Sequence, residues 1–387
     1  MTTNGHAIER IEIFVIRHRL NPRTGPSIAL SSEHAYALVK ATDGDGRAGW
    51  GETYLVPGVA SILEDTAPVL VGRRPADSIA LKRDIRWSAE HAYAASALTI
   101  AVEDLAARQL GISIAQWLGG AVRSRVRLYA ASGGYIDGVD PADSWPAEVE
   151  RIRDSGFTAM KWRVGRHPIA HEAPLLERIR GDVPDDFAMM ADGNAGYTLP
   201  RAIEMGGILE RLGFIWFEEP MVQRPNYARY DELSRALSIT LAAGEALETR
   251  GEAIDFLARR AADVIQPEPV ICGGAGEALW ISELAAAQST MAIPHTSNSA
   301  IGIALALQVI ACLPDPTRSP ASEELFLEYG VDDNPHRSGL LQTPLEFRDG
   351  WVTVPTGPGL GVEIDEEYVR GHATETRVVG ARAAAAG

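Results

Sequence analysis

Three acidic residues in the middle of the chain stand where apolar, strand-like stretches end. They are Asp192, Glu218 and Glu245, and intervals of 26 and 27 residues separate them. That interval is about the length of one strand-plus-helix unit of a parallel barrel, so the three carboxylates are expected to meet at one rim. A single acid in such a place is most often a solvated rim residue or a helix cap. Three in register would repel one another unless a cation lay among them.

An all-oxygen set of carboxylates suits a hard cation. Mg²⁺ is favoured because it keeps waters or substrate oxygens in an octahedral shell. The sequence therefore predicts a Mg²⁺ site formed by Asp192, Glu218 and Glu245. Asn194 is expected to support these ligands from the next layer. Glu219 is expected to point out of the site, because neighbouring strand residues face opposite ways.

An acid and a histidine follow the next two strand-like stretches. They are Glu268, after Gln266-Pro267, and His295, after Pro294. A carboxylate beside an imidazole fixes its tautomer and raises its basicity, as a general base near neutral pH requires. A lone histidine at a strand end is more often a structural hydrogen-bonding residue, but next to a metal rim the catalytic interpretation is favoured. We therefore expect His295 to be a base that Glu268 positions.

Two cations and one further acid complete the candidate site. Lys161 and Arg163 lie two positions apart on one strand-like stretch and so share a face. They are expected to neutralise charge on a substrate, with a salt bridge to the acidic rim as the alternative. Glu328 ends the last strand-like stretch and is a candidate acid.

The composition excludes several classes of partner. The chain has 387 residues, and its 36 basic and 52 acidic residues give a net charge of −16, which argues against nucleic acid or an anionic membrane surface. The longest apolar run, residues 300–313, is interrupted by Gln308 and is too short to span a membrane. Two cysteines, Cys272 and Cys312, are too few for a disulfide scaffold, so a cytoplasmic location is expected.

The elements that must position these residues alternate between short apolar strands and helical stretches. From residue 126 onward this pattern is that of a (β/α) barrel, with reactive groups at the carboxyl-terminal rim of the strands. Before it, antiparallel strands and helices indicate an α+β domain that ends near residue 125. Residues 19–32 have the Pro- and Gly-punctuated composition of a mobile loop. The expected barrel strands are 126–131, 157–162, 187–191, 214–217, 239–243, 262–266, 290–294 and 324–327.

A set of short motifs runs through essentially the whole chain. These motifs are Gly49-Trp50-Gly51-Glu52, Leu118-Gly119-Gly120, Lys161-Trp162-Arg163-Val164-Gly165, Asp192-Gly193-Asn194, Phe217-Glu218-Glu219-Pro220, Gly244-Glu245, Gln266-Pro267-Glu268 with Gly273-Gly274, Pro294-His295, Leu327-Glu328-Tyr329, Asp333-Asn334-Pro335 and Gly357-Pro358-Gly359-Leu360-Gly361. With them the sequence resembles the enolase superfamily and, within it, the mandelate racemase subgroup (the mandelate racemase/muconate lactonizing enzyme family). The resemblance implies an α/β fold, with a modified (β/α)8 TIM-type barrel at 126–345. It further implies an α+β capping domain at 1–125 that the carboxyl-terminal segment, 346–387, completes.

The resemblance also implies a chemistry. In that family Mg²⁺, held here by the three acids described first, and an acid at the last strand stabilise an enediolate. The enediolate forms when a base removes the proton α to a carboxylate of a small-molecule substrate. By the family's layout the segments 19–32 and 53–59 cover the mouth of the site, with Arg23 and Tyr54 as candidate substrate contacts. The family also suggests a homo-oligomer.

Two positions depart from the family's usual pattern. Where the subgroup commonly has Lys-x-Lys, this chain has Lys161-x-Arg163, and arginine is a poor base because it is effectively always protonated. Where an aspartate usually supports the histidine, Glu268 is one methylene longer. Racemisation needs a base on each face of the enediolate, whereas elimination can run with His295 alone. We therefore favour the dehydration of an acid sugar.

Other functions are weighed against this one. A racemase, epimerase or cycloisomerase acting on a 2-hydroxy acid, sugar lactone or amino-acid derivative begins with the same enediolate. A catalytically silent binding protein that keeps the barrel conflicts with the joint presence of metal, base and acid positions. A hydrolase of the amidohydrolase type usually needs a His-x-His triplet at the first strand, and the sequence contains none.

Overall fold

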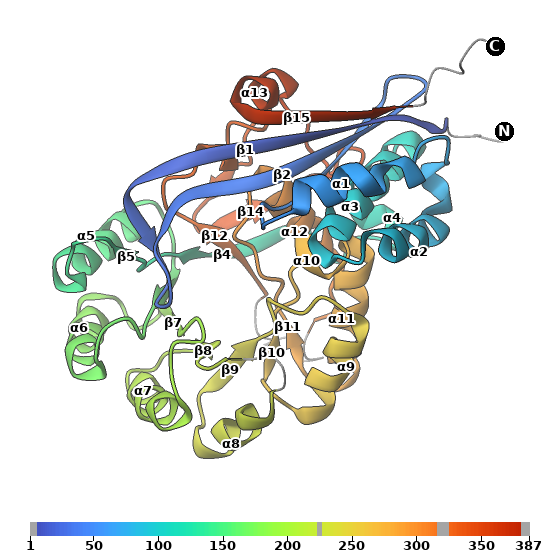
Figure 1. The fold of residues 1–387 in the computed structure, drawn as a ribbon. Helices are drawn as coiled ribbons and strands as arrows, with labels where there is room; N and C mark the ends of the chain where they lie inside the picture. The colour runs from blue at the N-terminus through green and yellow to red at the C-terminus, as the bar shows by residue number, and fades with distance from the viewer. Residues whose placement is uncertain (1–5, 223–226, 316–324, 381–387) are drawn as a thin grey trace, which may run out of the picture.

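A sheet-and-helix capping domain lies over the mouth of a barrel in the computed structural model, which describes residues 6–222, 227–315 and 325–380 (Figure 1). The capping sheet has the order β15-β1-β2-β3, and its neighbouring strands are antiparallel. A short strand, β5, pairs with the far end of β1. The strands are β1 (Ile8–Gly25), β2 (Ser31–Asp43), β3 (Ala48–Tyr54), β5 (Tyr135–Ile136) and β15 (Ala373–Gly380).

The long first strand corrects one prediction from the sequence. Residues 19–32 were expected to be a loop, but β1 continues to Gly25, and β2 begins at Ser31. The strand continues because β2 pairs with it through Arg19 and because Thr24 pairs with Ile136, more than a hundred residues away. Neither the length of this hairpin nor the distant partner is visible in local composition.

Four helices complete the amino-terminal part of the capping domain. The longest, α3, is almost wholly buried against β3. Two glycines of β3 permit this close approach, since a Cβ at Gly51 would lie 2.1 Å from the carbonyl oxygen of Ala97 and one at Gly49 would lie 2.4 Å from that of Ala101. The helices are α1 (Val59–Thr66), α2 (Ser78–Ala89), α3 (Ala92–Leu110) and α4 (Ile114–Trp117), with 3₁₀ turns at η1 (Ala67–Val69) and η2 (Pro75–Asp77).

Within the described residues, eight parallel strands form the barrel, as the sequence predicts. Their hydrogen-bonded order runs β11-β10-β9-β8-β7-β6-β4, and β12 pairs with the other side of β4. Strands β10 and β11 differ most in length from the prediction: they have two residues each, and Pro267 and Pro294, which follow them, cannot donate to a ladder. The predicted first residue of the last strand, Glu324, lies outside the described residues. The strands are β4 (Arg125–Ala131), β6 (Ala159–Arg163), β7 (Ala188–Asp192), β8 (Trp216–Glu218), β9 (Thr240–Ala243), β10 (Val264–Ile265), β11 (Met291–Ala292) and β12 (Phe326–Gly330).

Helices surround the barrel and shield its apolar strands (Figure 1). No helix in the described part of the chain is both long enough and apolar enough to cross a bilayer. The barrel helices are α5 (Pro141–Asp154), α6 (Ile169–Asp182), α7 (Leu199–Arg211), α8 (Ala228–Ala236), α9 (Arg250–Arg259), α10 (Pro269–Cys272), α11 (Ala275–Ala287) and α12 (Ala300–Cys312).

The carboxyl-terminal segment serves both units. Its first hairpin, β13 (Phe347–Arg348) and β14 (Trp351–Thr353), joins the barrel sheet through β4. After α13 (Glu366–His372), strand β15 pairs with β1 along the edge of the capping sheet. A 3₁₀ turn, η3 (Pro335–Arg337), connects the last barrel strand to this segment.

Candidate active site at the barrel rim

The three predicted acids gather at the carboxyl-terminal ends of β7, β8 and β9. Asp192 and Glu218 are the last residues of adjacent strands, lie opposite each other in the ladder and are fully buried. Glu245 follows β9 after Gly244, whose φ of +117° turns the chain toward the rim. Burial first, and then the repulsion of neighbouring carboxylates, raises the pKa of Glu218. Burial likewise raises the pKa of Glu245.

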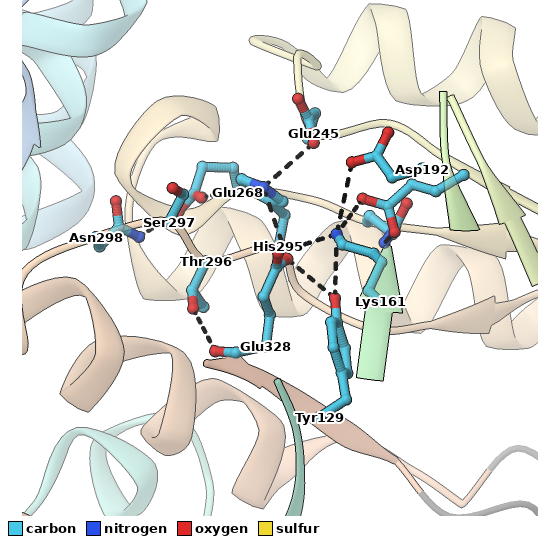
Figure 2. Close-up of polar contacts among 12 residues, drawn as sticks. Tyr129, Lys161, Asp192, Glu245, Glu268, His295, Thr296, Ser297, Asn298 and Glu328 are labelled. Carbon is cyan, nitrogen blue, oxygen red and sulfur yellow. Dashed lines mark hydrogen bonds and ion pairs between the residues drawn. The ribbon is translucent and has the colours of Figure 1, made fainter. Parts of the chain in front are cut away.

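Lys161 lies among these carboxylates (Figure 2), and Arg163 is paired with Asp192. The Nζ of Lys161 is 2.5 Å from Glu218 Oε1 and 3.8 Å from Asp192 Oδ2. Arg163 donates from Nη1 to Asp192 Oδ2. Burial alone would lower the pKa values of both cations, but the surrounding carboxylates raise them above their usual range. Both therefore stay charged and face the rim, as their shared strand face predicts.

Neutral side chains hold the acids in place. Asn194 donates from its amide to Asp192 Oδ2 at 2.9 Å, and its backbone N–H donates to Asp192 Oδ1 at 2.7 Å. Glu218 Oε2 accepts hydrogen bonds from Gln266 Nε2 at 2.9 Å and from Trp216 Nε1 at 3.2 Å. The contact of Asn194 with Asp192 agrees with the prediction. The contacts of Gln266 and Trp216 with Glu218 were not predicted, because only their position next to a strand end could be read from the sequence.

The acids fit a hard divalent cation by their chemistry. No group of three or more acid, histidine or cysteine side chains among the described residues stands in the arrangement of a metal site, since Lys161 and Arg163 lie between the carboxylates. The donors are nevertheless all oxygens, and neighbouring carboxylates help to raise the pKa values of Glu218 and Glu245. One of them, the buried Glu245 Oε2, accepts no hydrogen bond within the described structure, although His295 Nε2 lies 3.2 Å from it. A cation such as Mg²⁺ would relieve the repulsion between the carboxylates.

His295 and Glu268 form the predicted pair. His295 Nδ1 lies 2.7 Å from Glu268 Oε2, which leaves Nε2 facing the rim, 3.2 Å from Glu245 Oε2 (Figure 2). Glu268 is fully buried and also accepts from Asn298 Nδ2 at 3.0 Å and from Tyr54 OH at 3.2 Å. These donors fix the carboxylate, and the carboxylate fixes the imidazole. The contact of Asn298 was not predicted, because residues beyond the strand end carry no periodic signal.

The residues around His295 favour the protonated form of its imidazole. Burial lowers its pKa, but the facing Glu245, Glu328 and Glu268 raise that pKa well above the usual range. Glu328 lies fully buried on β12, 2.9 Å from Lys161 Nζ, and accepts from Tyr129 OH at 2.9 Å. Although burial raises the pKa of Glu328, Lys161 and His295 lower it below its usual range. Glu328 thus lies between Lys161 and Tyr129, and its lowered pKa favours the ionised form in this arrangement.

Three further predictions can be compared with the structure. Arg23 is paired with Asp137 at 2.7 Å, with its side chain 55% exposed, and does not line the cavity above the rim. Tyr54, a candidate substrate contact, ends β3 and donates to Glu268 Oε2 at 3.2 Å. Glu219, which was expected to point out of the site, is buried with a φ of +37°, and burial, followed by the charges of Glu245 and Asp192, raises its pKa.

A carboxylate of the capping domain anchors the segment that follows His295. Glu52 on β3 is fully buried and accepts hydrogen bonds from the backbone N–H groups of Ser299 at 2.8 Å and Gly302 at 3.1 Å. It also accepts from the hydroxyl of Ser299. These donors lie at the amino-terminal end of α12, where backbone N–H groups lack partners within the helix. The capping domain therefore holds the start of α12, and with it the segment that carries the imidazole.

The barrel lies beneath an α+β cap, and at its rim a histidine–carboxylate pair faces clustered acids and paired cations. This arrangement defines an enolase-type enzyme. The chain belongs to the mandelate racemase/muconate lactonizing enzyme family. Its residues 10–119 match "Mandelate racemase / muconate lactonizing enzyme, N-terminal domain", and residues 145–368 match "Enolase C-terminal domain-like".

Similar proteins in this family act on sugar-derived acids. The chain is 32% identical over 372 residues to a D-galactarolactone cycloisomerase of Agrobacterium fabrum, covering 93% of this chain and 97% of that protein. The structure of a 3,6-anhydro-D-galactonate cycloisomerase from Zobellia galactanivorans has a TM-score of 0.84 and 26% identity, covering 95% of this chain and 100% of that one. An L-talarate/galactarate dehydratase from Salmonella typhimurium, liganded with Mg and L-lyxarohydroxamate, has a TM-score of 0.85 and 26% identity, covering 98% and 96%. The expected lyase or isomerase class is confirmed, since these relatives are dehydratases and cycloisomerases.

Proposed function

We propose that this protein removes the proton α to the carboxylate of an acid sugar and then expels an oxygen from the β-carbon. The observation that carries the proposal is the orientation of His295. Its Nδ1 is held by Glu268 at 2.7 Å, and its Nε2 faces the rim, 3.2 Å from Glu245 Oε2, where Lys161 lies among the same carboxylates (Figure 2). A positioned imidazole opposite fixed positive charge is what α-proton abstraction requires.

We assign the cofactor Mg²⁺ to Asp192, Glu218 and Glu245, with Asn194 holding Asp192. The support is the all-oxygen donor set and the bound Mg in the similar dehydratase structure. Bound there, Mg²⁺ would neutralise charge that develops on the substrate carboxylate, and would offset the acids that now keep a proton on His295. Lys161 and Arg163 lie beside the same acids and supply fixed positive charge for the substrate carboxylate.

The chemistry assigned to this chain's residues has two steps. In the first, His295 Nε2 accepts the α-proton, the C–H bond breaks, and its electron pair forms the enediolate. In the second, the bond between the β-carbon and its oxygen breaks, and His295 returns the proton to that departing oxygen. One imidazole serves both steps, so no second base is needed.

The leaving oxygen separates two reactions. If it is a free hydroxyl, water is lost and the enol product becomes a 2-keto-3-deoxy acid; this dehydration is the function we favour. If it is the oxygen of a ring, the ring opens and nothing is lost, which is the reaction of a cycloisomerase. The 32% identical cycloisomerase supports this second candidate. Racemisation is disfavoured, because the carboxylates around Arg163 raise its pKa and leave it unable to accept a proton.

Proton NMR in D₂O with Mg²⁺ tests the proposal on a panel of aldonates, aldarates and their lactones. Loss of water with deuterium in the product supports dehydration, and ring opening without loss of water supports the cycloisomerase. Clean inversion at the α-carbon of the best substrate, with no β-oxygen expelled, would contradict both.

We further propose that the enzyme acts as a cytoplasmic homo-oligomer on a small-molecule carboxylate. The support is the family's suggestion of an oligomer and the two cysteines, Cys272 and Cys312, which are both free thiols. Light scattering coupled to size exclusion measures the assembly. A monomer at micromolar concentration would contradict the oligomer.

A further inference from the structure

A cavity of about 380 Å³ lies beyond the catalytic rim, between the far end of β1 and the barrel. Arg163 and Thr296, which follows His295, line its near side, so a substrate held at the rim would extend into it. The far side is formed by residues of β2, α5 and the segment after β12. Their chemistry decides which end of an acid sugar the cavity accepts.

An arginine and an aspartate form a buried pair in the far wall. Arg337, with its side chain 6% exposed, is 2.5 Å from Asp332 Oδ1 through Nη1, and His34 Nε2 lies 2.5 Å from Asp332 Oδ2. The guanidinium fits because residue 330 is glycine; a Cβ there would lie 2.3 Å from Arg337 Nη2. Burial alone would raise the pKa of Asp332, but His34 and Arg337 hold it well below its usual range. Asp332 is therefore ionised, and its negative charge neutralises the positive charge of Arg337.

Further acids lie in the same wall. Glu148 on α5 accepts a hydrogen bond from the hydroxyl of Ser132, and burial raises its pKa. Asp333 also lines the cavity and is paired with His18 at 2.9 Å. Each cation among the described lining residues already has a carboxylate partner: Arg163 pairs with Asp192, and Arg337 and His34 pair with Asp332.

The far wall can satisfy hydroxyls better than a second carboxylate. Arg337 lines the cavity, and its guanidinium is held by Asp332 through Nη1. Asp332 and Glu148 offer acceptors for hydroxyl groups. A second carboxylate would face these two acids and Asp333 without an unpaired cation to offset them, and like charges brought together in a partly desolvated site repel strongly. The remaining polar lining is neutral and comprises Asn21, Thr24, Ser31, Ser132, Thr296 and Ser297.

We propose that the substrate is a monocarboxylate acid sugar with an uncharged far end, an aldonate or a sugar-lactone acid, and that Asp332 and Glu148 exclude dicarboxylates of the same length. This selectivity rests on the proposed function, because it assumes that the reacting carboxylate binds at the rim. The additional point is the chemistry of the other end of the substrate, which is uncharged, and the residues that select it, Asp332 and Glu148.

The test compares kcat/KM for aldonates and aldarates of matched length and stereochemistry, with Mg²⁺ present. The wild-type protein is expected to prefer the aldonate by about ten-fold or more. Asp332→Asn removes one charge and releases Arg337, so the ratio should fall by roughly ten-fold, the order expected for one charge in a partly desolvated site. Glu148→Gln should lower the ratio in the same direction. Asp255→Asn makes the same chemical change to an exposed carboxylate on α9 and should leave the ratio unchanged.

Deuterium exchange at the α-carbon, measured in the same samples, separates two kinds of failure. Two results would overturn this inference alone. The first is a wild-type protein that prefers aldarates in exchange or turnover. The second is an aldonate-to-aldarate ratio of kcat/KM that stays unchanged in both the Asp332→Asn and Glu148→Gln variants. No exchange in any aldonate, aldarate or lactone would overturn the proposed function, and this inference with it. Glu148→Gln keeps the test decisive if Asp332→Asn fails to fold, because it leaves the pair of Arg337 and Asp332 intact.

Discussion

Replacing Glu52 by glutamine should change how the stability of the protein depends on pH. Burial raises the pKa of this carboxyl from 4.5 to about 7, although the Ser299 and Gly302 donors oppose the rise. Between pH 4.5 and about pH 7 the carboxyl of Glu52 therefore keeps its proton in the folded state and loses it in the unfolded state. The stability that this proton contributes is complete below pH 4.5 and is lost as the pH rises through 7.

The size of the effect follows from the shift itself. A rise of 2.5 units from 4.5 to about 7 corresponds to roughly 3 kcal/mol, at 1.36 kcal/mol per unit. Glu52→Gln keeps the side chain's shape but cannot ionise. The difference in unfolding free energy between wild type and variant should therefore fall by about 3 kcal/mol between pH 4.5 and pH 8. Urea denaturation followed by circular dichroism, at steps of half a pH unit, measures this difference.

A matched variant tests the assigned cause. Ser299→Ala removes the hydroxyl that favours the ionised form of Glu52, so the pKa of Glu52 should rise further and the loss of stability should continue to higher pH. A difference between wild type and Glu52→Gln that stays flat within about 0.5 kcal/mol from pH 4.5 to 8 would refute the reasoning. A loss that ends at a lower pH in Ser299→Ala than in the wild type would refute the role given to the hydroxyl.

Three further outcomes are expected. Asp192→Asn should weaken Mg²⁺ binding at least about ten-fold and abolish turnover with the fold intact, and unchanged affinity by calorimetry would contradict the assigned ligands. His295→Asn should reduce α-carbon deuterium exchange by about 10²- to 10⁴-fold, and Glu268→Gln by less; wild-type exchange in the histidine variant would exclude it as the base. Burial first, and then its histidine neighbours, lowers the pKa of His336 from 6.5 to about 4, so the unfolded state takes up the proton and stability is lost as the pH falls from 6.5 to 4. His336→Gln should remove up to about 3 kcal/mol of that loss in acid denaturation, and an identical acid slope in both proteins would argue against a buried neutral imidazole.

The positions of the rim residues could be predicted because a parallel barrel brings the carboxyl ends of all its strands to one edge. Spacing along the chain therefore translated directly into proximity for Asp192 and Glu218, which the structure places side by side. The same logic brought His295 to Glu268. For these residues, the spacing along the chain and the topology of the barrel predict the same contacts.

Other contacts could not be predicted, because their partners lie on different elements with no common period. Tyr54 reaches Glu268 across 214 residues, and Tyr129 reaches Glu328 across 199. The loop predicted at residues 19–32 is largely strand, because its pairing with β2 and β5 outweighs its composition. The ionised state of Glu328 likewise depends on Lys161, a neighbour only in three dimensions.

The pairing of β15 with β1 affects how the protein is made in the cell. Arg10 lies opposite Gly380, so the edge of β1 that β15 covers has no partner there until residues 373–380 have left the ribosome. At a synthesis rate of roughly 5–20 residues per second, that edge stays open for tens of seconds. An open strand edge is a template for pairing with other chains. Nascent molecules should therefore be prone to aggregate while β15 has not yet been synthesised, and a chaperone that shields the first strand would raise the yield of folded enzyme.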